Sequence, residues 1–192
     1  MAGRYLLFIH GYEGTFQSYK GRCLRDYLAK YYSDVSLIIP QLACYPRPAW
    51  QQIEEIIENY QDKLAGIIGA SMGGFMAAKA SVISSLPAVL VNPLADLDQV
   101  RMLLGEHIHP HTKEQYCLTE KHFYQLKQLQ VSPEQMSSRQ WLLLQTGDEI
   151  LDFRKALQAY PNTRQSVECG GNHGFVGFHR YVPAIIRFLL ED

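Results

Sequence analysis

Short apolar runs alternate with amphipathic stretches along this chain of 192 residues. The runs are rich in β-branched and aromatic residues and lack period-two alternation, as expected of strands covered on both faces. Between them, apolar residues recur every three or four positions, which predicts helices with one buried stripe. Six repeats of this pattern predict a parallel sheet with helices on both faces, because right-handed crossovers allow little else. The predicted strands are residues 4–10, 36–40, 64–69, 87–91, 141–146 and 165–169.

The composition fits one ordinary globular domain that spans residues 1–192, with 47% hydrophobic and 19% charged residues. A net charge of −1 gives no sign of nucleic-acid binding. The most lipid-like run, residues 184–190, is interrupted by Arg187, so no membrane span is expected. The chain shows no signal-peptide pattern, which makes the cytoplasm the expected location.

The four cysteines, Cys23, Cys44, Cys117 and Cys169, show no paired spacing. In a chain that can build a normal core, this pattern predicts reduced, mostly buried thiols. It disfavours a disulfide framework and a zinc site. Neither a metal nor a cofactor is expected.

Residues 92–140 interrupt the alternation of strands and helices. This connection is several times longer than the roughly two to six residues usual in α/β units. We interpret residues 94–140 as a helical cap inserted within the single domain. Helical pieces are expected at 96–104 and 120–130. A third is expected at 132–135, where serine, proline and glutamine form a capping-box pattern.

Gly69-Ala70-Ser71-Met72-Gly73 lies between a predicted strand and a predicted helix. The pattern G-x-S-x-G in that setting predicts a nucleophile elbow, a turn so tight that the neighbours of the serine must be small. Gly69 and Gly73 meet that demand. The five residues alone more often mark an ordinary turn, so the specificity comes from the strand before them and the helix after them.

Three reactive side chains follow predicted strands. Ser71 comes after the third strand, Asp148 after the fifth and His173 after the sixth. Ligands of open parallel sheets bind beyond the carboxyl ends of the strands, so these residues are expected to meet. A serine hydroxyl needs an imidazole to accept its proton, and a buried carboxylate fixes the imidazole tautomer. We therefore predict Ser71 as nucleophile, His173 as base and Asp148 as the orienting acid.

Alternatives exist for two of these assignments. A lone histidine in a glycine loop is more often structural, and only the elbow favours a catalytic His173. Other carboxylates compete with Asp148, namely Asp96 and Asp98 after the fourth strand and the neighbouring Glu149 and Asp152.

An oxyanion formed at Ser71 would need two backbone donors. We predict the N–H of Met72, directly after the nucleophile, and the N–H of Tyr12. Gly11 allows the backbone at Tyr12 to approach from the first strand. His10 is expected only to support this loop through hydrogen bonds to backbone.

Three histidines alternate in the sequence His107-Ile108-His109-Pro110-His111. Such spacing can converge on zinc, but no cysteine or second ligand group accompanies it and a proline interrupts the run. The favoured interpretation is a solvated loop of the cap. Contact of these histidines with a polar group of a substrate stays open as an intermediate case.

These features resemble the α/β-hydrolase superfamily and, more closely, the small bacterial YqiA-type esterases. The similarity extends over nearly the whole chain, and residues 145–149 and 170–173 are its more specific stretches. The resemblance implies a three-layer α/β-hydrolase fold and a cytoplasmic esterase without cofactor, with its triad on Ser71, Asp148 and His173. Acyl esters, and acyl-CoA thioesters as a further class, are the implied substrates. The histidine-rich 107–111 loop departs from the family pattern. The matching stretches are residues 8–12, 38–42, 69–74, 91–93, 145–149 and 170–173.

The leading functional hypothesis is a serine esterase that hydrolyses a small-molecule acyl ester through an acyl-enzyme on Ser71. A peptidase or a carbon–carbon bond hydrolase is an alternative, because the same elbow serves all of them. A binding protein for an acyl ligand, without catalysis, is the alternative outside enzymes.

Overall fold

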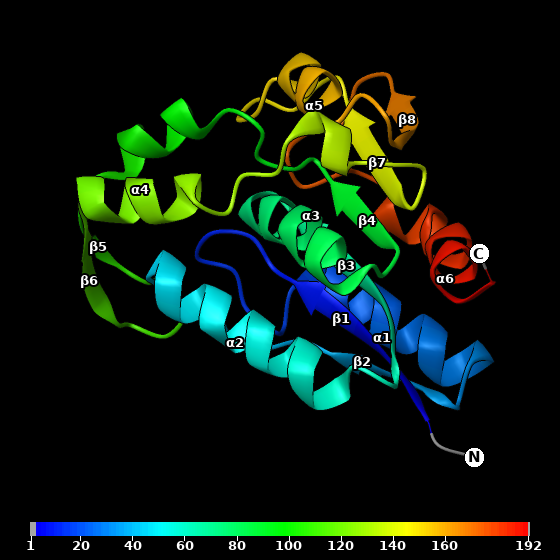
Figure 1. Cartoon of the computed structure of the whole chain (residues 1–192). Helices are drawn as coiled ribbons and strands as arrows, with labels where there is room; N and C mark the ends of the chain where they lie inside the picture. The colour runs from blue at the N-terminus through cyan, green and yellow to red at the C-terminus, as the bar shows by residue number, and fades with distance from the viewer. Residues whose placement is uncertain (1–2, 192) are drawn as a thin grey trace.

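The computed structural model describes residues 3–191, and a six-stranded sheet forms its centre. Every neighbouring pair of strands is parallel, in the order β2-β1-β3-β4-β7-β8 (Figure 1). The predicted fold class is therefore confirmed, and each predicted strand is correct to within two residues at either end. The strands are β1 (Arg4–Ile9), β2 (Val35–Ile38), β3 (Leu64–Ala70), β4 (Ala88–Val91), β7 (Gln140–Gln145) and β8 (Arg164–Glu168).

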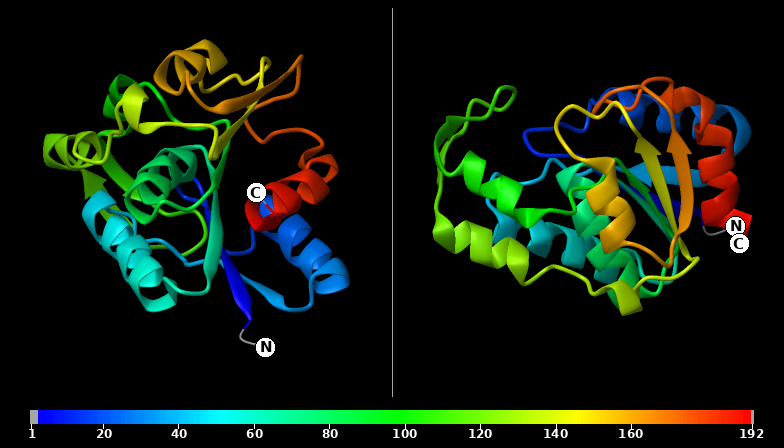
Figure 2. Two further views of the ribbon diagram at one scale, coloured as in Figure 1. Left: turned by 45° about the vertical axis from the view of Figure 1, so that its right-hand side comes forward. Right: turned by 90° about the horizontal axis from the view of Figure 1, so that it is seen from above.

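Helices cover both faces of this sheet (Figure 2). Alternate residues of one strand enter two separate apolar cores, as Leu6 of β1 packs under α1 and α6 while Leu7 packs under α2 and α3. Burial on both faces explains why the strands lack period-two alternation. No helix within residues 3–191 is long and apolar enough to cross a membrane. The α-helices flanking the sheet are α1 (Tyr19–Tyr31), α2 (Pro46–Tyr60), α3 (Met72–Ser84), α5 (Phe153–Ala159) and α6 (Val182–Glu191), and a short 3-10 helix, η3 (Phe178–Arg180), precedes α6.

Helix α2 begins at Pro46, and both Pro46 and Pro48 lie in its first turn. Proline is compatible with the first helical turn, because the backbone N–H groups there have no partner inside the helix. This start carries α2 to the carboxyl end of the sheet, where the candidate site lies.

The 94–140 segment contains a β-hairpin that the sequence prediction missed. Its antiparallel strands β5 (Gly105–Ile108) and β6 (Gln115–Leu118) have only four residues each and mixed polarity, so they carry a weak strand signal. The hairpin lies at the edge of the molecule beside α2 and α4, away from the large sheet (Figure 1). The other elements are helical, as expected: η1 (Leu97–Leu103), α4 (Glu120–Lys127) and η2 (Pro133–Gln135).

The prediction of mostly buried cysteines was wrong. Cys117 and Cys169 are exposed, and Cys23 and Cys44 are partly exposed. Cys117 lies at an outward-facing position of the hairpin, which explains its exposure. All four are free thiols within the described part of the chain.

Candidate active site

Ser71 occupies the tight turn between β3 and α3. Its φ of 56° and ψ of −124° lie in a region that L-residues rarely adopt and that costs about 1–3 kcal/mol. The glycines on either side are sterically required. A Cβ on Gly69 would lie 2.2 Å from the carbonyl oxygen of Gly73, and a Cβ on Gly73 would lie 2.2 Å from that of Ile9. The predicted elbow geometry is therefore present.

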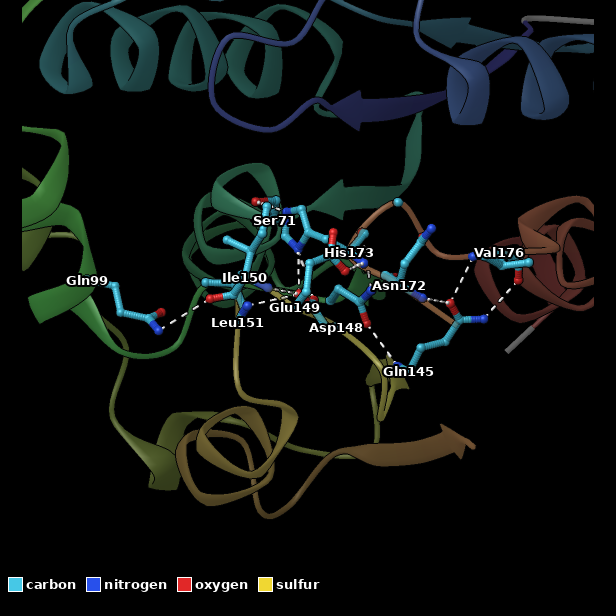
Figure 3. Close-up of polar contacts among 12 residues, drawn as sticks. Ser71, Gln99, Gln145, Asp148, Glu149, Ile150, Leu151, Asn172, His173 and Val176 are labelled. Carbon is cyan, nitrogen blue, oxygen red and sulfur yellow. Dashed lines mark hydrogen bonds and ion pairs between the residues drawn. The ribbon is translucent and has the colours of Figure 1, made fainter. Parts of the chain in front are cut away.

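The structure brings the three predicted reactive side chains together (Figure 3). The Nε2 atom of His173 lies 3.0 Å from the Oγ atom of Ser71. On the other side of the ring, Nδ1 lies 2.9 Å from Oδ2 and 3.0 Å from Oδ1 of Asp148. Each residue follows the carboxyl end of a different strand, β3, β7 or β8. These contacts form one continuous chain from hydroxyl to carboxylate.

The carboxylate of Asp148 is almost fully buried, with 2% of its side chain exposed. Burial raises the pKa of this carboxyl, but hydrogen bonds from His173 and from the backbone N–H groups of Leu151 and Ile150 outweigh it, so the pKa lies below its usual value. These two N–H groups donate to Oδ1 at 2.8 and 2.9 Å. An ionised Asp148 holds the imidazole hydrogen on Nδ1, which leaves the Nε2 lone pair facing Ser71.

The competing carboxylates do not contact the imidazole ring. Glu149 accepts the backbone N–H of His173 at 3.0 Å, so it supports the loop rather than the ring. The others cap helices or pair with arginine and lysine: Asp96 accepts the N–H of Asp98 and approaches Lys155, Asp98 pairs with Arg101, and Asp152 accepts from Arg154.

The two predicted oxyanion donors lie beside Ser71. Within residues 3–191, the backbone N–H groups of Tyr12 and Met72 have no hydrogen-bond partner. Gly11 packs directly on the elbow, because a Cβ added to it would lie 3.0 Å from the Cβ of Ser71. Neither N–H group is thus used by another group of the described chain.

His10 is buried at the end of β1 and makes two hydrogen bonds. Its Nδ1 donates to the carbonyl of Gly11 at 2.9 Å, and its Nε2 accepts the N–H of Leu42 at 3.2 Å. Burial lowers the pKa of His10, which keeps the ring neutral. The ring therefore connects the Gly11–Tyr12 turn to the loop before α2, in line with the supporting role that the sequence predicts.

Two buried amide side chains that the sequence analysis gave no role hold the loop of His173. Asn92 donates to the carbonyls of Asn172 and His173 at 3.1 and 3.2 Å, and its Oδ1 accepts the N–H of Gln145. The Gln145 side chain accepts the N–H groups of Asn172 and Val176 (Figure 3). Asn92 directly follows the apolar strand β4, and Gln145 is the last residue of β7. A polar residue at the end of an apolar strand was the sequence signal that could have identified both.

We predict that Asn92→Asp weakens both the fold and the site. The substitution replaces two donated hydrogen bonds by an oxygen that faces two carbonyls, with a cost of about 1–3 kcal/mol for the buried groups left unpaired. Thermal unfolding is expected at a temperature lower by several degrees, and ester turnover is expected to fall about tenfold or more. Asn162→Asp is the matched control, because the Asn162 side chain is exposed and bonds only the carbonyl of Pro133. Equal effects of the two substitutions would contradict the positioning role.

A polar contact ties the Gly11–Tyr12 turn to the 94–140 segment. The Tyr116 hydroxyl donates to the carboxylate of Glu13 at 2.8 Å. This bond uses the only hydroxyl hydrogen of Tyr116, so in the contact between the two tyrosines the Tyr12 hydroxyl donates to Tyr116. The residue that supplies a predicted oxyanion donor is thus held by the hairpin.

The interpretation of residues 107–111 as a solvated loop was wrong for two of the three histidines. His107 lies on β5 and stacks on Tyr116, and His109 is buried with 3% exposed. Only His111 is exposed. Burial follows because the hairpin packs this stretch inward, which the sequence spacing did not reveal. Within residues 3–191, no group of three or more His, Cys, Asp or Glu side chains is placed to hold a metal ion.

Two hollows lie near Ser71: one is lined by its neighbour Met72, and the other by Ser71 itself. An apolar cavity is lined by Tyr12, Met72 and side chains of α2 and of the 94–140 segment. A more open cleft is lined by Ser71, His173 and Lys20. The Lys20 ammonium donates to the carbonyl of Gly174 at 2.7 Å, and burial lowers its pKa to about 8. The first hollow is therefore almost wholly apolar, and the second has polar groups within a mixed wall.

The fold is the α/β-hydrolase fold, and solved structures share it. Est1E from Butyrivibrio proteoclasticus superposes with a TM-score of 0.74 at 13% identity, over 98% of this chain and 88% of that one. Mouse alpha/beta hydrolase domain-containing protein 10 gives 0.72 at 15% identity, over 97% and 90%. The esterase domain of a Rhodothermus marinus protein gives 0.67 at 13% identity, over 94% and 84%.

Residues 5–190 match the model of the uncharacterised protein family UPF0227. The chain belongs to this family, which confirms the resemblance seen in the sequence.

Proposed function

We propose that the protein is a serine esterase that hydrolyses carboxylic acyl esters through an acyl-enzyme on Ser71. The continuous contact from Ser71 through His173 to Asp148 is the observation that carries this proposal. The name of the Rhodothermus marinus esterase domain supports ester chemistry by analogy of fold. Acyl thioesters are a second substrate class for the same chemistry.

The proposed reaction follows from the geometry. Ser71 Oγ attacks the ester carbonyl while His173 Nε2 takes its proton, and the carbonyl oxygen receives hydrogen bonds from the N–H groups of Tyr12 and Met72. His173 then protonates the departing alcohol. A water molecule enters, gives its proton to His173 and attacks the acyl-enzyme, which releases the acid and restores Ser71.

The two hollows suggest how the ester lies. The acyl group occupies the apolar cavity next to Met72, and the alcohol leaves through the cleft that Lys20 lines. This orientation places the carbonyl at the boundary between the hollows, where Ser71 and the two N–H donors meet.

Labelling with a fluorophosphonate probe tests the nucleophile directly. We expect the probe to modify Ser71, identified by peptide mass spectrometry, because an activated serine hydroxyl attacks phosphorus as it attacks a carbonyl. His173→Ala should slow the labelling strongly, whereas exposed His111→Asn should not. Folded protein with an unlabelled Ser71 would reject the proposal.

A substrate panel separates the remaining functions. We expect turnover of butyrate esters and no cleavage of the matching peptides. Crossing acyl length with oxyester or thioester defines the preferred leaving group. Tight binding of an acyl ligand without turnover would instead favour the non-catalytic alternative, and peptide cleavage would favour a peptidase.

A further inference from the structure

His109 is a buried histidine next to the end of β5, outside the proposed triad. Its Nδ1 accepts the backbone N–H groups of His111 and Thr112 at 3.2 and 3.1 Å. An imidazole nitrogen that accepts two hydrogen bonds carries no hydrogen, so in the neutral ring the hydrogen is on Nε2. The ring therefore presents one N–H donor on the side away from its own turn.

This donor has no partner within residues 3–191. The one unpartnered polar side-chain atom that is fully enclosed in this part of the chain is Oε1 of Gln125. The Nε2 of His109 is thus not enclosed by protein and borders open space. His109 is one of the residues that line the apolar cavity beside Tyr12 and Met72.

The cavity is larger than a site for one water molecule. The space inside it that is open to the centre of a water-sized sphere is about 50 Å³, against roughly 10–15 Å³ needed for one water. Aliphatic and aromatic side chains form most of its wall, among them Met76, Leu118, Phe123 and Leu126. An N–H group in such a wall costs free energy unless an acceptor reaches it.

The acceptor that fits is uncharged. Glu13, whose carboxylate accepts from the Tyr116 hydroxyl, lines the same cavity, so an anionic group there would be both desolvated and repelled. An ether, hydroxyl or keto oxygen within an otherwise apolar chain meets both conditions.

We propose that His109 is a specificity-determining residue that donates from Nε2 to an uncharged oxygen on the acyl group of the substrate. The preferred substrates are then esters of oxygen-bearing acyl chains rather than of plain alkanoic acids. This inference rests on the proposed esterase function, and on the acyl group lying in the apolar cavity.

The test uses 4-nitrophenyl esters of one chain length. One series member is the plain alkanoate, and in the others a single methylene beyond the α-carbon is replaced by an ether oxygen at successive positions. For the wild type, we expect one oxygen position to raise kcat/KM relative to its neighbours by about tenfold, since a site built around a donor discriminates against chains that lack the acceptor.

His109→Asn removes the donor while the Asn oxygen can still accept the two backbone N–H groups of the turn. This variant should lose the preference, so that the ether-bearing esters and the plain alkanoate react with similar kcat/KM. His109→Gln, which can place an amide N–H near the position of Nε2, should retain part of it. His111→Asn is the control, because His111 is exposed on the same turn and should leave the preference intact.

The outcomes separate the inference from the function it rests on. Ester turnover without any oxygen preference in the wild type, or with a preference unchanged in His109→Asn, overturns the role of His109 alone. Absence of ester turnover together with an unlabelled Ser71 rejects the esterase function and the inference with it. If His109→Asn does not fold, the wild type is compared with His109→Gln instead, and a preference equal to that of the wild type would overturn the role of His109.

Discussion

Ser71→Ala and His173→Ala are each expected to lower kcat for a 4-nitrophenyl ester by about 10⁴- to 10⁶-fold, and the double variant should be no worse than either single one. Ser71 and His173 share one hydrogen bond and act in one proton transfer, so the loss of either partner removes the same step. Steady-state kinetics of the three variants against the wild type measure this directly.

Folding should be little affected in Ser71→Ala, since the Cβ and the strained backbone of the elbow are the same for serine and alanine. Thermal unfolding near the wild-type temperature is the necessary control. Losses that multiply in the double variant would mean that the two side chains act independently. That result would contradict a shared proton transfer across the 3.0 Å contact.

Asp148→Asn is expected to lower kcat about 10⁴-fold near neutral pH, although the shape of the side chain is kept. The Asn oxygen at the position of Oδ1 still accepts the N–H groups of Ile150 and Leu151. The amide nitrogen then faces His173 Nδ1 and donates to it. The imidazole hydrogen moves to Nε2, so Ser71 has no acceptor for its proton.

Asp152→Asn provides the matched control for this prediction. Asp152 lies four residues further along, caps α5 and pairs with Arg154, without contact to His173. The control should retain wild-type kcat. A similar loss in both variants would point to general destabilisation of the loop after β7, and full activity of Asp148→Asn would reject Asp148 as the orienting acid.

The sequence alone determined the parallel sheet and the residues that come together at its edge. Short, period-free runs rich in β-branched and aromatic residues are typical of strands covered on both faces, and alternation with helices forces the carboxyl ends of the strands to one edge. Ser71, Asp148 and His173 all follow such ends, so their proximity followed from topology. The glycines of the elbow were equally readable, because their requirement is local and steric.

Tertiary structure decided the features that depend on packing between distant segments. The hairpin of β5 and β6 has no periodic signal of its own and forms where four-residue strands pack beside α2 and α4. That packing buries His109, which the sequence placed in a solvated loop. The roles of Asn92 and Gln145 likewise required the fold, since their partners lie 23 to 81 residues away along the chain. Local sequence spacing reflects the steric limits of turns and the periodicity of helices and strands. The partners of a buried polar group are instead determined by which distant segments pack against it.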